Sequence, residues 1–319
     1  MEIVFSEKED IPEIVELLKR SLGEKRMPKT QAYYIWKHQK NPFGQSITLV
    51  AKESGKIVGV RTFMKWEWSF GEKKIASVRA VDTATDPLYQ GKGIFRMLTL
   101  KAIDECKREG ISFIYNTPNP ISLKGYLKMG WNSIGKMPLN VRLGSIIPGF
   151  FDEIKNEKYY QEYDVENQLK KLPNSWSFKQ PKSISTELTI PYLNWRYVEC
   201  PVSSYGALIE PGKFGIIFRL KKIKLFYEFR ICEYWLENSV YSEEAELKIR
   251  SVIKKIKPLV VTESFFEKKV PLSNNIKLNF ASPFIGPLTT VKNLTNINNK
   301  SELIRFDIWS PSLGAMELF

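Results

Sequence analysis

The chain has 319 residues, of which 43% are hydrophobic and 26% are charged, so it can bury the cores of two ordinary domains and is not disordered. Its net charge of +13 suits polyanions and phosphorylated small molecules alike. No recognised reader motif accompanies the basic residues, and nucleic acid is therefore not an expected partner. A single histidine disfavours Ser-His-Asp and Cys-His chemistry and His-based zinc sites.

The N-terminal sequence and the cysteine content predict a cytoplasmic protein. The opening MEIVFSEKED carries acidic residues where a signal peptide needs a basic start and an apolar run. No stretch approaches the roughly 18 apolar residues of a membrane helix. Cys106, Cys200 and Cys232 lack the spacing of metal ligands, which fits a reducing compartment. We expect no metal and no membrane span, and the oligomeric state stays open.

The first elements are a helix and three strands. Residues 9–22 have an apolar face at helical spacing after acidic residues that suit a helix start. The apolar positions are Ile11, Ile14, Val15, Leu17 and Leu18. Residues 46–70 read as two β-runs around a turn at 53–56, and residues 73–86 read as a third strand that ends at Pro87.

A glycine-rich turn joins this strand to the next helix. The helix is predicted over 94–109, with Gly110 as its stop, and is followed by an apolar strand at 111–119 and a short helix at 120–131. The order of helix, antiparallel strands, strand–loop–helix, strand and helix predicts an α/β layer fold.

The turn has the residues that bind a diphosphate. Gly91 and Gly93 lack side chains that would hold a ligand away, and they let consecutive amide groups point into one concavity. The dipole of the following helix adds positive potential. A dinucleotide fingerprint would need a third glycine and an early strand, and neither is present. The alternative is a turn that merely tolerates glycine.

These elements resemble the GNAT superfamily of acyl-CoA-dependent N-acyltransferases over about 130 residues. The family's glycine loop matches Pro87-Leu88-Tyr89-Gln90-Gly91-Lys92-Gly93-Ile94. A second family motif matches Asn119, Ser122, Tyr126 and Gly130-Trp131, with Trp in place of the more usual Phe. The resemblance implies an α/β (α+β) GNAT fold, with a mixed, mostly antiparallel sheet flanked by helices, in an active acetyltransferase domain at residues 1–140.

The resemblance also implies the cofactor and its contacts. Acetyl-CoA is the expected co-substrate, and a primary amine attacks its thioester. The implied coenzyme-binding residues are Thr83, Thr85, Gln90, Gly91, Lys92, Gly93, Ile94 and Asn119. Tyr126 takes the place of the family's general acid, which gives a proton to the departing sulfur, and a backbone amide stabilises the oxyanion. The alternatives are a packing role for Tyr126 and a turn role for Asn119.

The general base stays open at this stage. Asp82 lies on the strand near the reaction centre and is one catalytic candidate, although strand alternation can turn it away from the substrate. Glu67, on the preceding β-run, is another candidate. A third possibility is that no dedicated base exists and that the amine proton passes to water.

The second half repeats the pattern after a linker with helical segments at 141–184. Three strands are expected at 204–210, 214–222 and 224–236, then a helix at 242–256 capped by Ser242, and a strand at 258–265. The turn before that helix has no Gly-x-Gly and contains acidic residues. We therefore expect residues 185–319 to form a degenerate GNAT-like domain without a coenzyme site.

Two further segments extend the resemblance. The segment at 190–201 is similar to one in tandem GNAT-like proteins, although an amphipathic helix explains it as well. Its aromatic and basic residues are Tyr192, Trp195, Arg196 and Tyr197. The apolar tail SPSLGAMELF predicts a docked terminus, whose last residue, Phe319, either packs or brings its carboxylate to the active site as the base.

The acceptor is the least determined part of the prediction. The first hypothesis is an amino sugar on a nucleotide or lipid carrier, a small-molecule amine with or without a phosphate group. A peptide, polyamine or antibiotic amine is the alternative within the enzyme class. A non-catalytic acyl-CoA-binding module would not need Tyr126, and a DNA-associated regulator fits the charge but no motif.

Overall fold

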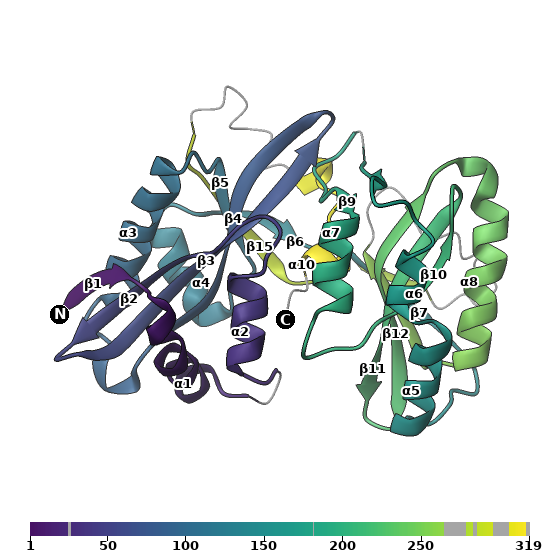
Figure 1. The fold of residues 1–319 in the computed structure, drawn as a ribbon, viewed down its shortest axis with the longest axis horizontal. Helices are drawn as coiled ribbons and strands as arrows, with labels where there is room; N and C mark the ends of the chain where they lie inside the picture. Colours follow the sequence, from purple (N-terminus) through teal and green to yellow (C-terminus); the bar gives the residue numbers. More distant parts are fainter. Residues whose placement is uncertain (25–26, 181, 265–278, 283–285, 296–305, 317–319) are drawn as a thin grey trace. The chain divides into compact units, whose positions relative to one another are not determined.

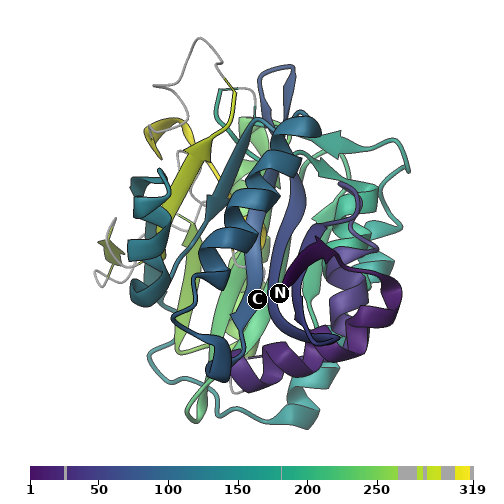
Figure 2. The same ribbon diagram turned by 90° about the vertical axis from the view of Figure 1, so that its left-hand side faces the viewer.

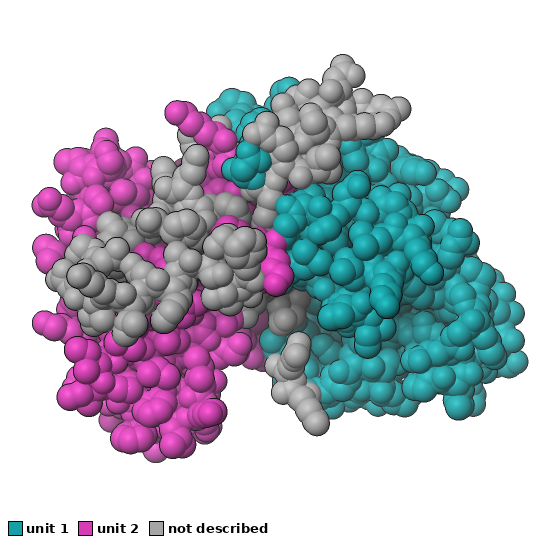
Figure 3. Space-filling model, turned by 180° about the vertical axis from the view of Figure 1, so that it is seen from behind, with its two compact units in different colours: residues 1–135, 287–308 teal, residues 136–286, 309–319 magenta. Residues whose placement is uncertain are grey.

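A computed structural model of the chain describes residues 1–24, 27–180, 182–264, 279–282, 286–295 and 306–316 (Figures 1 and 2). The chain divides into two compact units, coloured in Figure 3. Unit 1 contains Met1–Gly135 and Pro287–Ile308, and unit 2 contains Lys136–Gly286 and Trp309–Phe319. Each unit is built around its own large sheet.

The sheet of unit 1 is mixed and mostly antiparallel. Its strand order is β1 (Glu2–Phe5), β2 (Ile47–Glu53), β3 (Lys56–Phe70), β4 (Lys73–Thr85), β5 (Phe113–Asn116), β15 (Leu288–Asn293) and β6 (Asn132–Lys136). β4 and β5 pair in parallel, whereas β1–β2, β2–β3, β3–β4 and β5–β15 pair antiparallel. The crossover between the parallel strands is a helix, as such a connection requires.

Helices cover both faces of this sheet. Because neighbouring residues of a strand point to opposite sides, each face contributes to a core of its own. The helices are α1 (Ile11–Leu22), α2 (Gln31–His38), α3 (Ile94–Arg108) and α4 (Pro120–Lys128). Val50 packs in the α1–α2 core, whereas Leu49 and Ala51 pack in the core formed with α3 and α4. The predicted α1 is confirmed with all its apolar positions buried, but neither α2 nor β1 was predicted.

The sheet of unit 2 has the order β10 (Gly206–Glu210), β11 (Phe214–Ile223), β12 (Phe226–Leu236), β13 (Val260–Ser264), β7 (Leu139–Leu143) and β14 (Asn279–Ser282). Its longest helix, α8 (Ser242–Ile256), buries one apolar face in the core of this sheet. The remaining elements are α5 (Glu153–Glu162), α6 (Val165–Leu169), α7 (Ile190–Leu193), a π-helix at Asn194–Val198, α10 (Leu313–Met316) and a small sheet of β8 (Ser177–Phe178) and β9 (Leu188–Thr189).

The two units repeat one topology. In unit 1 two antiparallel pairings (β2–β3 and β3–β4) are followed by α3 and the parallel pairing β4–β5. In unit 2 β10, β11, β12, α8 and β13 follow the same order with the same directions. The repeat of strands and helix expected in the second half is therefore present in the order and directions of the elements. Ser242 is not a cap, because it is the first helical residue and no side chain caps α8.

The two halves of the chain exchange one strand each. β15 comes after α5, α6, α7 and α8 of unit 2 in sequence, yet it pairs with β5 of unit 1. β7 precedes them, yet it pairs with β13 of unit 2. The predicted contiguous boundaries at 1–140 and 185–319 therefore differ from the units observed. No local sequence pattern shows which edge of which sheet a strand near the end of the chain will join.

The tail is docked within unit 2, as the sequence predicted. Leu313, Gly314 and Met316 of α10 are buried. Arg196 donates a hydrogen bond through Nε to the carbonyl oxygen of Gly314, at 3.3 Å. Phe319 lies outside the described residues.

Candidate active site

A cavity of unit 1 opens where β4 and β5 stop pairing. Their parallel ladder ends at Arg79 and Tyr115, while β4 runs on to Thr85. A cavity of about 770 Å³ occupies the space that this leaves, and both strands contribute to its wall. A volume of this size is typical of sites for small molecules and cofactors.

A β-bulge shapes the β4 wall. The pairing of β3 with β4 passes from Val60–Ala84 to Thr62–Val81, so one residue of β3 lies opposite Asp82 and Thr83. Asp82 has a φ of 38°, in the left-handed region that non-glycine residues rarely adopt. Bulges of this kind re-aim side chains and end pairing beside active sites.

The glycine turn forms one end of the cavity. Gly91 and Gly93 have φ angles of 80° and 77°, and Gly93 is the N-cap of α3. As a glycine, this N-cap has no side chain that could accept a hydrogen bond from the first turn of α3. A Cβ built on either glycine meets no atom of the described residues within 4 Å, so the turn borders open space in this part of the structure. Unblocked amides at a helix start, beside free space, fit a diphosphate.

Tyr126 lies at another part of the wall, on α4. Its side chain is buried, and its hydroxyl accepts a hydrogen bond of 2.6 Å from Nη1 of Arg61. Asn119 is the N-cap of α4, and its Oδ1 accepts hydrogen bonds from the amide and the hydroxyl of Ser122. Asn119 thus fixes the start of the helix that carries Tyr126.

Asp82 is held by two residues of α2. Its Oδ2 accepts hydrogen bonds from Nζ of Lys37 at 2.5 Å and from Nε2 of His38 at 2.8 Å. Although burial opposes its ionisation, Lys37 and His38 hold the pKa of Asp82 well below its usual range. A carboxylate in this state is a weak base, so the geometry favours an anchoring role for Asp82 over proton abstraction.

Most of the residues predicted from the sequence meet in this cavity. Those that line it are Asp82, Thr83, Thr85, Gln90, Gly91, Gly93, Ile94, Asn119 and Tyr126. Lys92 does not line it, and its Nζ lies 4.4 Å from the ring centre of Tyr89. Glu67 does not line it either and pairs with Lys74 at 2.9 Å. Sequence reasoning did not find Arg61 or the contacts of α2.

Residues 2–134 match the family described as the acetyltransferase (GNAT) domain. Residues 2–134 are a GNAT domain. The match covers the glycine turn, the diverging strands and Tyr126 together. No curated protein matches the sequence significantly.

The likeness to solved structures extends beyond the GNAT domain and covers most of the chain. A probable N-acyltransferase from Enterococcus faecalis has a TM-score of 0.63 at 11% identity, over 92% of this chain and 72% of the other. A GCN5-related N-acetyltransferase from Anabaena variabilis gives 0.61 at 12%, over 92% and 73%. N-myristoyltransferase of Saccharomyces cerevisiae, with bound myristoyl-CoA, gives 0.52 at 11%, over 91% and 82%. At these identities the likeness establishes a shared fold.

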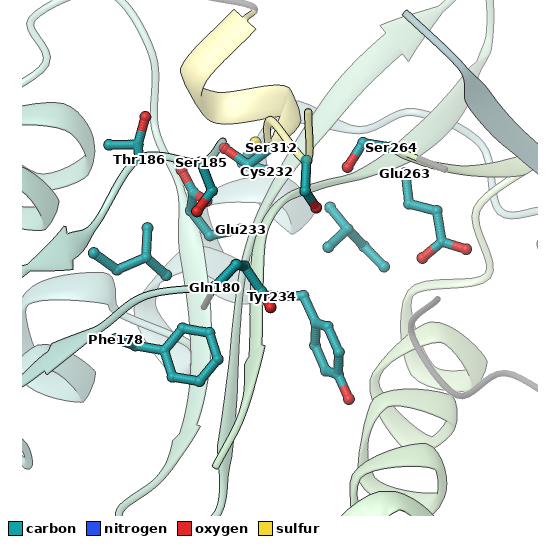
Figure 4. A pocket seen from close by; sticks show the side chains of 13 residues that line it. Phe178, Gln180, Ser185, Thr186, Cys232, Glu233, Tyr234, Glu263, Ser264 and Ser312 are labelled. Carbon is teal, nitrogen blue, oxygen red and sulfur yellow. The ribbon is translucent and has the colours of Figure 1, made fainter. Parts of the chain in front are cut away.

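Unit 2 has a smaller cavity at the position that corresponds to the site of the GNAT domain. The parallel ladder of β12 and β13 ends at Arg230 and Thr262, and a cavity of about 70 Å³ lies beyond it (Figure 4). Two buried carboxylates, Glu233 and Glu263, line this cavity. Tyr192 and Tyr197 donate hydrogen bonds to Glu233, and burial raises the pKa of this carboxyl.

The described parts of both units give two further results. Among the described residues, no group of three or more His, Cys, Asp or Glu side chains could hold a metal ion. Over the same residues, no helix is long and apolar enough to cross a membrane.

The buried histidine of the GNAT domain predicts a pH dependence of stability. Burial lowers the pKa of His38 below its ordinary value of 6.5, so the folded protein keeps the ring neutral where the unfolded chain takes up a proton. The free energy of unfolding should therefore fall as the pH drops below 6.5, with a slope of up to about 1.4 kcal/mol per pH unit. Asp82 stays ionised in this window, since its pKa is held far lower.

Chemical denaturation between about pH 5 and pH 8, around the ordinary pKa of histidine, measures this effect. His38→Gln keeps groups that can bond Asp82 and Ser46, both of which the ring contacts, but it does not titrate. Its unfolding free energy should change less with pH than that of the wild type. Parallel curves for the two proteins would show that His38 does not cause the dependence.

Proposed function

We propose that the chain is an acetyl-CoA-dependent N-acetyltransferase acting on a primary amine. One observation carries the proposal: a single cavity contains both the open glycine turn at the start of α3 and the hydroxyl of Tyr126. The glycine turn suits the diphosphate of an acyl-CoA. The hydroxyl of Tyr126 suits the role of proton donor to the sulfur of the acyl-CoA.

The residues of the cavity divide the work between binding and proton transfer. The bound acyl-CoA supplies a thioester whose acyl carbon accepts the amine. In this proposal, backbone groups of Thr83 and Thr85, on the end of β4 that does not pair with β5, hold the pantetheine arm, and the amides from Gly91 to Ile94 hold the diphosphate. Tyr126 donates its proton to the sulfur that leaves. Asp82 holds α2 against β4.

Unit 2 serves, in this proposal, as a GNAT-like repeat without a coenzyme site. Glu243 and Glu244 lie in the first turn of α8, where unit 1 has its glycine turn. The cavity beyond β12 and β13 is about 70 Å³ and is lined by Glu233 and Glu263. Acidic residues at a helix start repel a diphosphate, and so small a space cannot hold a pantetheine arm.

The acceptor in this proposal is an amino sugar on a nucleotide or lipid carrier. The net charge of +13 favours a phosphorylated acceptor. The experiment is a thiol-release assay on the full chain with acetyl-CoA and a panel of nucleotide amino sugars, polyamines, aminoglycosides and short peptides. Myristoyl-CoA is a second donor in the panel, because a structure of similar fold binds it.

Release of thiol with a nucleotide amino sugar supports the whole proposal. Release only with a peptide, a polyamine or an aminoglycoside supports the acetyltransferase activity and shows that the acceptor is a different amine. Tight binding of acetyl-CoA by calorimetry, without release in any arm, identifies a coenzyme-binding module instead. A chain that does not bind acetyl-CoA would overturn the proposal.

A further inference from the structure

A buried arginine lies directly behind the tyrosine of the cavity. Arg61 is on β3, opposite the bulge of β4, and none of its side chain is exposed to solvent. Its Nη1 donates hydrogen bonds to the hydroxyl of Tyr126 at 2.6 Å and to Oγ1 of Thr83 at 2.5 Å. Its Nε and Nη2 have no hydrogen-bond partner among the described residues.

Packing alone gives a poor reason for this arginine. Its guanidinium carbon lies 4.5 Å from the ring centre of Phe63, 5.6 Å from that of Phe95 and 5.2 Å from that of Tyr126. No acidic side chain of the described residues forms an ion pair with it. Aromatic faces offset part of the cost of a buried cation, but an apolar side chain of similar size would fill the space at a lower cost.

The direction of the hydrogen bond fixes the orientation of the tyrosine proton. A guanidinium group has donors and no acceptor, so the oxygen of Tyr126 must accept and its own proton must point elsewhere. No group of the described residues accepts that proton. Because Tyr126 lines the cavity, the proton is available to a ligand bound there.

We propose that Arg61 is the positioning residue for proton transfer by Tyr126, an inference that rests on the proposed function. The amine nitrogen bonds to the acyl carbon, the carbon–sulfur bond breaks, and the sulfur takes the proton of Tyr126. The phenolate that remains is stabilised by a charge-assisted hydrogen bond from Arg61. It regains a proton from solvent, which receives the proton lost by the amine.

Thr83 extends the same arrangement to the β4 wall. Its hydroxyl accepts from Arg61 and donates to the carbonyl oxygen of Val81, at 3.2 Å. One buried cation therefore connects the strand that is placed to hold the pantetheine arm with the helix that carries the acid. The distance between the sulfur and Tyr126 depends on both elements, so Arg61 sets it from both sides.

A double-mutant cycle tests this role. The variants are Arg61→Met, Tyr126→Phe and the pair, assayed for thiol release from acetyl-CoA with hydroxylamine as the probe amine and the uncatalysed rate subtracted. Arg61→Met should lower kcat by about 10- to 100-fold, no more than the lower end of the roughly 100- to 10,000-fold that general acid–base catalysis contributes, because Tyr126 itself is kept. Acetyl-CoA affinity should stay within about twofold of the wild type. In the Tyr126→Phe background it should lower kcat no further.

Arg61→Lys keeps the charge and a donor and should recover about tenfold of the lost kcat. Arg61→Gln provides a second neutral variant if Arg61→Met does not fold. Arg196→Met is the matched control in unit 2, because Arg196 is also buried and donates to a tyrosine hydroxyl, that of Tyr205, at 2.8 Å. It should lower the melting temperature, and any effect on kcat should be the same with or without Tyr126.

Four outcomes would overturn the role of Arg61. In the first, Arg61→Met lowers kcat equally in the wild-type and Tyr126→Phe backgrounds, and in the second it leaves kcat unchanged. In the third, Arg61→Met lowers acetyl-CoA affinity together with kcat. In the fourth, Arg61→Lys has no higher kcat than the neutral variants. All four leave the acetyltransferase proposal intact. Failure of the wild type to bind acetyl-CoA overturns the proposed function itself, and the role of Arg61 with it.

Discussion

Gly93→Val is expected to abolish measurable binding of acetyl-CoA. The added side chain would extend into the space beside the amides of α3, where a Cβ meets no protein atom within 4 Å. It would therefore occupy the space proposed for the ligand. The φ of 77° also disfavours a β-branched residue and costs about 1–3 kcal/mol of stability. Isothermal titration calorimetry on the folded variant measures the affinity.

Gly110→Val separates the loss of space from the backbone strain. Gly110 follows the other end of α3 and has a φ of 71°. A Cβ at this position also meets no atom within 4 Å, but Gly110 does not line the cavity. The two variants should lose similar amounts of stability, and only Gly93→Val should lose acetyl-CoA. Unchanged affinity in a folded Gly93→Val protein would mean that the coenzyme does not bind at this turn.

Tyr126→Phe is expected to lower kcat by about 10- to 1000-fold, which overlaps the roughly 100- to 10,000-fold that general acid–base catalysis contributes. The phenyl ring keeps the contacts with Phe95 and Trp131, whose ring centres lie 5.5 Å and 5.1 Å away. Acetyl-CoA affinity should therefore change little, which separates proton transfer from binding. Steady-state thiol release and calorimetry measure the two quantities. The variant also loses some stability, because Nη1 of Arg61 loses one of its acceptors.

Tyr115→Phe is the matched control for the loss of kcat expected from Tyr126→Phe. Tyr115 is fully buried on β5, its hydroxyl has no hydrogen-bond partner among the described residues, and it does not line the cavity. Removing that hydroxyl should leave kcat unchanged and should not lower stability. If Tyr126→Phe turned over as fast as the wild type, Tyr126 would be a packing residue and the acid would have to be sought elsewhere.

The sequence predicts the parts of the site that depend on local patterns. The turn at Gly91 and Gly93 can be predicted because positive φ angles favour glycine. The strands around 53–56 follow from alternation and a turn signal. These local elements form much of the wall of the cavity, and most of its lining residues can therefore be predicted from the sequence.

The contacts that depend on distant residues are not predictable in the same way. Arg61 stands among apolar residues of β3 with nothing to show that it meets Tyr126, which is 65 positions away. Lys37 and His38 look like solvated polar residues, yet both are buried against Asp82. Buried polar partners are set by tertiary packing, which a single sequence does not display.

The exchange of strands has a consequence for the order in which the molecule can be completed during synthesis. The ribosome makes β5 long before β15, and until β15 emerges one edge of β5 has no partner. Asn116, in the wall of the cavity, receives its hydrogen bond from Thr290 of that late strand. A chain that terminates early, even one with every residue of the glycine turn and α4, therefore lacks a finished site. The wall of the cavity is completed only after translation has passed β15, shortly before α10 of unit 2.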